Sequence, residues 1–234
     1  MIISTNSANA SQQEAQTITT EIWKTGPSAE VMFQMLWESP CFRQSNQIAK
    51  YGPHLHLFAA WCARRTSHLL TDKQSHHAIQ TAERFATATT SRAAMHQAHL
   101  AAEAVVIRIA ANYEILSATE NMSAITNSGS NGIDTRATRA AALLNAATAA
   151  ATCCLAHQLF GPLQAADLCA KYARHSLYWE ALTNGSDAIL ITELLEEEDL
   201  RQAHTLRVFL GNPFNPIESP AMFLPQPQPD NLHQ

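Results

Sequence analysis

The positions of glycine and proline constrain the fold of this chain more than any other feature of its sequence. The seven glycines lie at positions 26, 52, 129, 132, 161, 185 and 211, and no proline occurs between Pro53 and Pro162. Helix interiors disfavour both residue types, by about 1 kcal/mol for glycine and about 3 kcal/mol for proline. Alanine, the best helix former, accounts for 40 of the 234 residues, and most of them lie between these breaks. The sequence therefore predicts an all-α, antiparallel helical bundle of about six to eight helices.

The same breaks predict one helical domain with two flexible tails. Residues 1–20 are rich in Ser, Asn, Gln and Thr, and they contain few apolar groups that could offset the entropy of ordering. Residues 21–216 form the predicted domain, with the segment 126–134 (TNSGSNGID) as a possible subdomain break. Residues 217–234 are rich in proline and glutamine and are expected to be extended.

Capping residues and breaks mark the ends of individual helices. The predicted N-caps are Ser28, Thr71 or Asp72, and Asp187. We expect Gly52-Pro53 to open one helix and Gly161-Pro162 to end another, which runs roughly over residues 135–159. Gly211 suits the left-handed position that follows a helix, and Asn212-Pro213 prevents the helix from continuing.

Two segments have apolar or aromatic residues at spacings that alternate between four and three. This pattern is typical of a helix that packs along its whole length against antiparallel neighbours. The first seam consists of Met95, His99, Ala102, Val106, Ile109, Tyr113 and Leu116. The second consists of Leu168, Tyr172, His175, Trp179 and Leu182. We expect both seams to face the core.

Charge and cysteine usage restrict the classes of function. The net charge of −5 makes nucleic-acid binding improbable on electrostatic grounds, because affinity for phosphate backbones depends mainly on basic side chains. The cysteines are odd in number, and two of them are adjacent, which does not indicate a disulfide framework. The N-terminus lacks the pattern of a secretory signal, and no apolar run is long enough to cross a membrane. We expect a soluble, cytoplasmic protein without a membrane segment.

Two groups of side chains have spacings that could bind a metal ion. His96, His99 and Glu103 lie at i, i+3 and i+7 of a predicted helix, and Cys153 and Cys154 lie within one turn of His157. The second group could also form a nucleophile and its base. The alternative is that His99 is a hydrogen-bonded core histidine and that the two thiols pack in the core. The chain lacks the ExxH and HExxH patterns of helical metal enzymes, and we predict no cofactor.

Charged clusters offer a further candidate surface. The segment from Lys171 to Trp179 mixes cations with aromatic rings, as a ligand or base-stacking surface would. Arg64, Arg65 and His68 form a second small basic cluster, whose alternative is pairing with nearby acids such as Asp72 or Glu83. Together with Lys171 and Arg174, the two arginines could support a weak association with nucleic acid. The acidic run from Glu196 to Asp199 is most simply a hydrated face, which could also meet a basic partner.

Three stretches of the chain resemble motifs of a known family. They are LHLFAAWCARRTSHLLTD at 55–72, SHHAIQTAERFA at 75–86 and LRVFLGNPFNPI at 206–217. Together they resemble an uncharacterised bacterial family of alanine-rich helical proteins with LRLFACACCRR, LLTD, AVEVAERYA and GNPFRP motifs. The opening TEIWKTGPSAEVMFQML is similar to the start of that family. The resemblance covers about residues 20–217 in outline.

The resemblance identifies motif residues but implies no activity. The positions that match are Cys62, Arg64, Arg65, Leu69, Thr71, Asp72, Glu83, Gly211, Asn212, Pro213 and Phe214. Clustered cysteines of the family are replaced here by Ala60 and Ala63, so any metal or redox role of that cluster would be absent. The resemblance implies that the remaining residues hold the fold: Asp72 as a cap with Arg64 or Arg65 as its partner, and Phe214 docked on the bundle.

Packing seams without an assembled catalytic set favour a non-enzymatic helical module that binds another protein. The alternative is a protein that binds a metal or small ligand through the histidine and cysteine groups, and the second alternative is weak nucleic-acid association. The sequence does not identify the partner or the oligomeric state.

Overall fold

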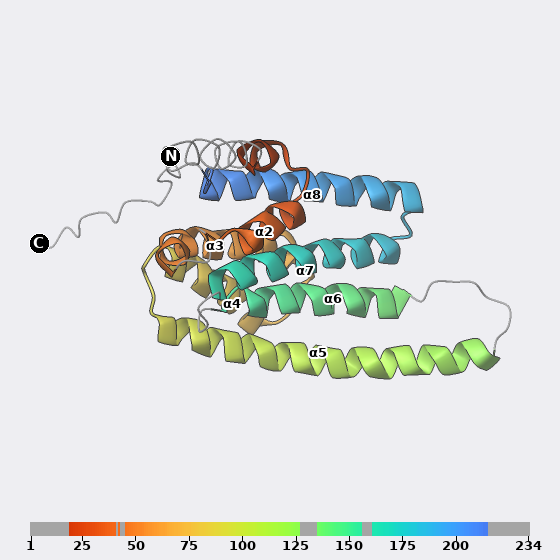
Figure 1. Cartoon of the computed structure of the whole chain (residues 1–234). Helices are drawn as coiled ribbons and strands as arrows, with labels where there is room; N and C mark the ends of the chain where they lie inside the picture. Colours follow the sequence, from red (N-terminus) through yellow and green to blue (C-terminus); the bar gives the residue numbers. More distant parts are fainter. Residues whose placement is uncertain (1–18, 41, 43–44, 127–134, 156–160, 215–234) are drawn as a thin grey trace, which may run out of the picture.

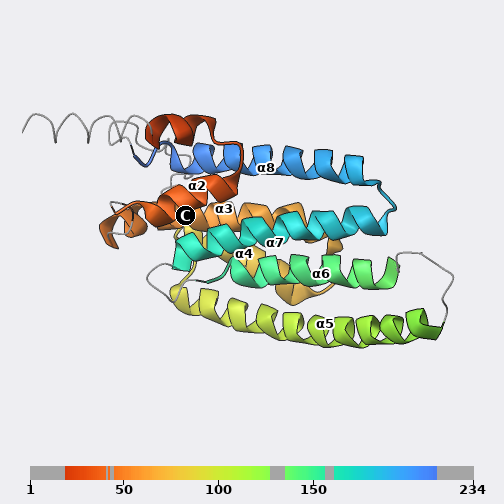
Figure 2. The ribbon, with the colours of Figure 1, turned by 45° about the vertical axis from the view of Figure 1, so that its right-hand side comes forward.

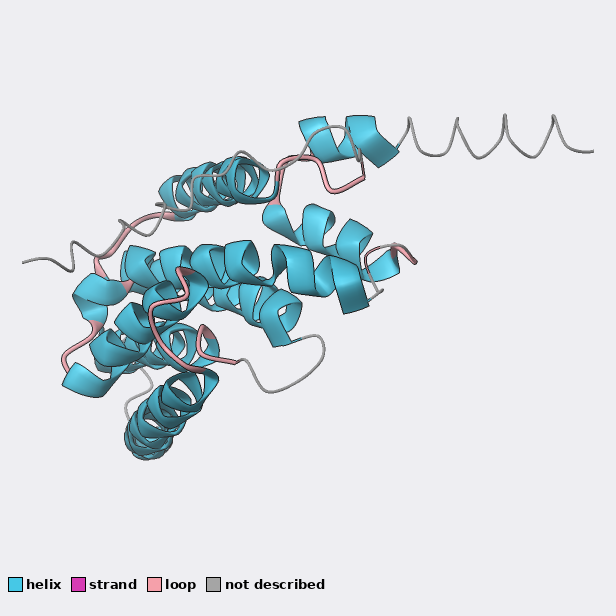
Figure 3. Ribbon diagram, turned by 90° about the vertical axis from the view of Figure 1, so that its left-hand side faces the viewer, coloured by secondary structure: helices cyan, strands magenta, loops and turns pink. Residues whose placement is uncertain are grey.

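The structure is a computed structural model of the chain, and it describes residues 19–40, 42, 45–126, 135–155 and 161–214. A short helical segment over residues 19–25 comes first. The elements that follow are α2 (Ala29–Glu38), α3 (Ser45–Arg65), the short 3-10 helix η1 (Ser67–Leu69), α4 (Lys73–Ala86), α5 (Arg92–Thr126), α6 (Thr135–Thr152), α7 (Gly161–Thr183) and α8 (Ala188–Leu210). The described residues contain no strand, which confirms the predicted all-α bundle (Figure 3).

The last four helices, α5 to α8, lie side by side and alternate in direction (Figures 1 and 2). In Figures 1 and 2, α5 forms one edge of the molecule, and α6, α7 and α8 follow in order. The segment 19–25 lies beside the C-terminal end of α8, on the side away from α5. Helix α3 packs against α7 and α4, and α4 also contacts α5. The predicted tails and the segment 127–134 lie outside the described residues, except that residues 19 and 20 already belong to the first helical segment.

Three helices begin at predicted N-caps. The backbone N–H of Val31 donates to the Ser28 hydroxyl over 3.4 Å, and that of Ser75 donates to the Asp72 carboxylate over 2.8 Å. The backbone N–H of Leu190 donates in the same way to the Asp187 carboxylate, over 2.9 Å. Each side chain pairs an N–H that has no partner within the helix. Of the two alternatives at the start of α4, the structure selects Asp72 over Thr71.

The start of α3 differs from the prediction, because Gly52 and Pro53 lie inside the helix. The first two turns stay helical because Ile48 and Tyr51 are buried: Ile48 is in the core, and the Tyr51 ring stacks on Phe42 with centroids 5.4 Å apart. A side chain at position 52 would meet the ring of Pro162 at 3.7 Å. The glycine therefore marks a close approach between α3 and the first turn of α7, and not a helix boundary.

The end of α6 was predicted about seven residues too late. The helix ends at Thr152. The N–H of Cys153 still donates four residues back, to Ala149, but those of Cys154 and Leu155 donate to carbonyls only three residues earlier. Gly161 and Pro162 are the first residues of α7 and do not end α6. Proline is tolerated in the first turn of a helix, where its missing N–H has no intrahelical acceptor.

The buried face of α7 is lined mostly by small side chains, so the second predicted seam lies beside the core contact and is only partly buried. His175 is exposed, and Leu168, Tyr172, Trp179 and Leu182 are only half-buried. The residues that are buried instead are Leu163, Ala165, Ala166, Cys169, Ala170, Ala173, Ser176, Leu177 and Ala181. They pack against the alanine-rich face of α6, because short side chains let the two helices approach closely. The larger side chains lie beside this contact.

The first predicted seam faces the bundle over its whole described length. Met95 and Ala102 are buried, and the other seam residues, from His99 to Leu116, are half-buried. Burial is complete only in the N-terminal half of α5, where α4 and α6 both contact it.

Candidate functional site

The motif residues at the end of α3 form two ion pairs with acidic residues of other helices. The Arg64 guanidinium donates to both carboxylate oxygens of Glu83, with both N–O distances at 2.8 Å. Arg65 donates from Nη2 to Glu198 over 2.9 Å. Neither arginine pairs with Asp72, whose two carboxylate oxygens accept from the backbone and hydroxyl of Ser75. The implied pairing of Asp72 with an arginine is therefore wrong, and the alternative of Glu83 is confirmed for Arg64.

Glu198 is a buried carboxylate that sequence reasoning placed on a hydrated face. Its side chain is 1% exposed and accepts from the Arg65 guanidinium and, over 3.1 Å, from the Gln202 amide. The adjacent Asp199 accepts from Arg174 over 2.8 Å. Only Glu196 and Glu197 of the acidic run are exposed. The helical period predicts which residues of the acidic run are buried, because residues 198 and 202 lie on the same face as the buried Leu206.

The first and last motifs of the chain meet in a contact between the two ends of the described structure. The Trp23 indole donates to the Gly211 carbonyl over 2.7 Å, and Arg207 donates from Nε to the Trp23 carbonyl over 2.9 Å. The Phe214 ring packs edge-on against Trp23, with centroids 5.5 Å apart. We call Trp23, Arg207, Gly211 and Phe214 the terminal clasp. Docking of Phe214 on the bundle is confirmed.

Gly211 ends α8 in a conformation that requires glycine. Its φ of 62° is positive as predicted, but its ψ of −139° lies outside the left-handed helical region. The Asn212 side chain then accepts from the backbone N–H of Phe214 over 3.1 Å, which closes a turn around Pro213. This turn aims Phe214 at Trp23. These motif residues contact other helices of the bundle, as expected for residues that stabilise the fold.

The four described cysteines are buried, and three of their thiols donate hydrogen bonds to backbone carbonyls. Cys153 donates to Ala150 over 3.1 Å, Cys154 to Ala78 over 3.1 Å and Cys169 to Ala149 over 3.3 Å. Burial raises the pKa of the Cys62 and Cys169 thiols, and a hydrogen bond with Cys154, together with burial, raises the pKa of Cys153. Protonated thiols are poor nucleophiles and poor metal ligands. The third member of this group, His157, lies outside the described residues.

The histidine group on α5 is split between the bundle and the surface. His99 lies towards α6, where its Nδ1 is 2.9 Å from the Ala151 carbonyl oxygen, whereas His96 and Glu103 are exposed. Among the residues that the structure describes, no three His, Cys, Asp or Glu side chains converge as a metal site would require. The contact of His99 with Ala151 agrees with the alternative that it is a hydrogen-bonded core histidine.

His56 is a buried histidine that no motif indicated. Its side chain is 2% exposed, lies edge-on to Phe85 with centroids 5.3 Å apart, and has no partner for Nδ1 among the described residues. Burial is the main cause that lowers its pKa from 6.5 to about 4, and the nearby charge of Arg92 lowers the pKa further. A hydrogen bond of the ring to the Cys153 backbone opposes this shift only in part. The ring is therefore neutral in the folded protein at pH 7.

Acidification should destabilise the fold through His56. The unfolded chain binds a proton near pH 6.5 whereas the folded chain does so only near pH 4, so stability is lost as the pH falls through this window. We expect a loss of about 2 kcal/mol between pH 7 and pH 5, measured by denaturant unfolding. The variant His56→Gln, which does not titrate, should lack this part of the pH dependence. An identical pH dependence in both proteins would contradict the assignment.

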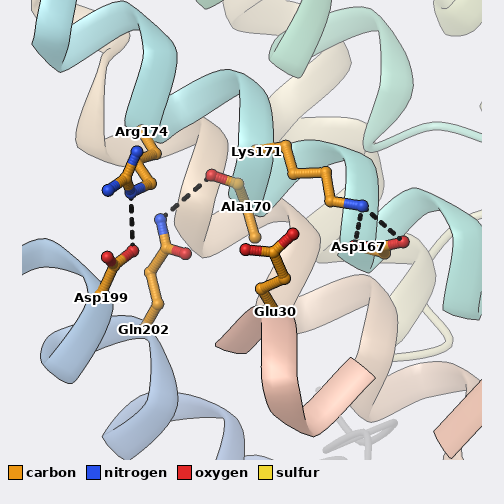
Figure 4. A pocket seen from close by; sticks show the side chains of 7 residues that line it. All are labelled: Glu30, Asp167, Ala170, Lys171, Arg174, Asp199 and Gln202. Carbon is orange, nitrogen blue, oxygen red and sulfur yellow. Dashed lines mark hydrogen bonds and ion pairs between the residues drawn. The ribbon is translucent and has the colours of Figure 1, made fainter. Parts of the chain in front are cut away.

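A small charged depression lies between α2, α7 and α8 (Figure 4). It has a volume of about 30 Å³ and is lined by Glu30, Asp167, Ala170, Lys171, Arg174, Asp199 and Gln202. Lys171 pairs with Asp167 at 3.1 Å and Arg174 with Asp199 at 2.8 Å, as the dashed lines in Figure 4 show. The space holds about one water molecule.

The basic residues considered for nucleic-acid contacts all form ion pairs with carboxylates. Arg64, Arg65, Lys171 and Arg174 each pair with a carboxylate of the chain. Tyr178 and Trp179, the aromatic part of the predicted ligand surface, lie edge-on to each other with ring centroids 5.2 Å apart. These pairings leave little positive charge for a phosphate backbone.

The outer face of α8 combines large apolar side chains with carboxylates. Ile189 is 70% exposed, Leu190 55%, Leu200 59% and Val208 44%. The helical period places exposed Glu193 and Glu196 on the same face. We call these six residues the α8 surface. Helix α8 lies on the far side of the bundle from α5 (Figures 1 and 2).

No helix in the described ranges has both the length and the apolar character needed to cross a bilayer. Comparison with known protein families, curated proteins and solved structures finds no match for this chain.

Proposed function

We propose that this chain is a non-enzymatic helical module that binds another protein, and that the α8 surface is its binding face. The observation that carries the proposal is the exposure of Ile189 and Leu200, at 70% and 59%, on one face of α8. Apolar patches rimmed by polar groups are typical of protein interaction sites. Burial of each such side chain in a complex contributes about 1.5–3 kcal/mol.

The charges of the α8 surface indicate the chemistry of the partner. Glu193 and Glu196 are exposed and form no ion pair in the described part of the chain. A partner segment with apolar anchors and flanking Lys or Arg residues would complement both kinds of side chain. Four buried cysteines without disulfides support a reducing compartment such as the cytoplasm for this encounter.

Quantitative affinity purification of the full chain tests the proposal. We expect a protein that wild type retains and that the variant Ile189→Ser/Leu200→Ser loses, with binding of the purified pair weakened more than tenfold. Raising the salt concentration should weaken the wild-type complex, because Glu193 and Glu196 contribute to it.

The matched control is Val31→Ser on α2, where the side chain is 36% exposed and lies outside the α8 surface. This variant should retain the same protein as wild type. Recovery of no protein that depends on the α8 surface, or equal loss in the control, would contradict the proposal.

A further inference from the structure

We propose that the outer face of α5 binds the same face of a second copy of this chain, with the two helices parallel. The face consists of Leu100, Ala104, Ile107, Ala111 and Ile115, which we call the α5 strip. All five residues are exposed, with Ile107 and Ile115 each at 65%. Helix α5 forms an edge of the bundle, and its contacts with α4 and α6 lie on the opposite side, around Met95 and Ala102 (Figures 1 and 2).

The strip has the repeat of a two-stranded coiled coil. Leu100 and Ile107 are seven residues apart, as are Ala104 and Ala111, with alternating spacings of four and three between them. In coiled-coil terms, Leu100 and Ile107 occupy d positions and the two alanines occupy a positions. Alanine at a allows two helices to approach closely, while the d residues supply the apolar contact.

Two charged residues on the flanks of the strip select a second copy in parallel orientation. Glu103 and Arg108 are exposed, occupy g and e positions, and form no ion pair with any described residue. Because they are five residues apart, they point about 140° away from each other on one helix and do not pair within it. In a parallel pair of helices, g of one chain faces the following e of the other. Glu103 then meets Arg108 of the second copy, and symmetry repeats the contact.

The antiparallel alternative lacks this complementarity. There, e positions face e positions, so that Arg108 approaches a second Arg108 or an apolar residue. In the parallel arrangement, Ile115 meets Ala110 of the second copy by the same g-to-e rule. Glu114 is the next d residue and is unfavourable, because it faces Glu114 of the second copy.

The size of the strip and the position of Glu114 limit the strength of the dimer. From Leu100 to Ile115 the strip is about 23 Å long, so it buries less than the roughly 800 Å² per partner of a standard interface. We therefore expect reversible self-association with a dissociation constant in the range of about 10–300 µM. The α5 strip is separate from the α8 surface, so this inference goes beyond the proposed function.

Sedimentation equilibrium of the full chain over a concentration series tests the proposal. Ile107→Glu should abolish association. Glu114→Leu fills the unfavourable d position and should strengthen association more than tenfold, a gain that unfolding does not produce. Circular dichroism of each variant shows whether the monomer remains folded. A wild-type monomer across the series would overturn the proposal.

A charge exchange tests the parallel orientation. Glu103→Arg should weaken the dimer several-fold, because it places two positive charges together, and Glu103→Arg/Arg108→Glu should restore wild-type association. Failure of the exchange to restore it would overturn the parallel pairing. Ile107→Glu should leave the interaction of the α8 surface unchanged, which separates the two hypotheses.

Discussion

Arg65→Met should lower the free energy of unfolding by about 3 kcal/mol, because it leaves a buried carboxylate without its main partner. Glu198 is 1% exposed and accepts two hydrogen bonds from the Arg65 guanidinium. Gln202 still donates to Glu198, and Arg201 lies 3.7 Å from it, so the loss should fall at the low end for a broken buried pair. Urea unfolding followed by circular dichroism measures the change.

The neighbouring arginine provides a matched control. Arg64 pairs with Glu83 at 2.8 Å, but both side chains are more than a third exposed. Arg64→Met should therefore cost only about 0–1 kcal/mol. The double variant Arg65→Met/Glu198→Leu removes both charges of the pair, including the buried carboxylate, and should recover most of the stability lost in Arg65→Met. If the double variant is no more stable than the single one, the loss arises from packing and not from the unpaired carboxylate.

Trp23→Ala should lower the free energy of unfolding by about 3–5 kcal/mol, because the terminal clasp is built around this ring. Trp23 is 1% exposed, packs against Phe214, and links the first helical segment to the end of α8 through its indole N–H. Its removal leaves a large cavity and an unpaired Gly211 carbonyl. Thermal and denaturant unfolding of the full chain measure the effect.

Trp23→Phe separates the hydrogen bond from the packing. Phenylalanine keeps much of the apolar contact with Phe214 but loses the donation to Gly211 and part of the ring volume, so the expected cost is about 1–2 kcal/mol. A loss as large as that of Trp23→Ala would mean that the hydrogen bond, and not the buried ring, holds the two ends together.

Local sequence signals predict where helices begin, but they fail where tertiary packing determines whether a helix continues. The caps Ser28, Asp72 and Asp187 act within one turn, so their residue types predict their positions. Gly52 and Pro53 give an equally strong local signal for a break, yet burial of the preceding turns keeps α3 continuous. Propensity is a weak preference that tertiary contacts override.

The second seam shows why residue size is a poor guide to burial in this chain. Large side chains such as Tyr172 and Trp179 were assigned to the core, whereas the structure buries Ala166, Ala173 and Ser176. A face of small side chains is buried only where a second helix with a similar face packs against it. The sequence of α7 alone does not show that α6 provides such an alanine face.

The candidate surfaces were only partly accessible to sequence reasoning. The exposed apolar residues of α8 and α5 share a helical period with buried ones, so their exposure depends on where neighbouring helices lie. Pairings such as Arg65 with Glu198 join residues more than a hundred positions apart. A single sequence supplies the residue types, but not these distances.

The alanine-lined contact between α6 and α7 also affects how the protein responds to temperature. Short side chains expose little apolar surface per residue on unfolding, and this surface provides most of the heat-capacity increment. The increment should therefore lie below the usual value of about 12–15 cal/mol/K per residue. A smaller increment flattens the stability curve, so the fold keeps a similar margin over a wide range of temperatures and resists cold denaturation.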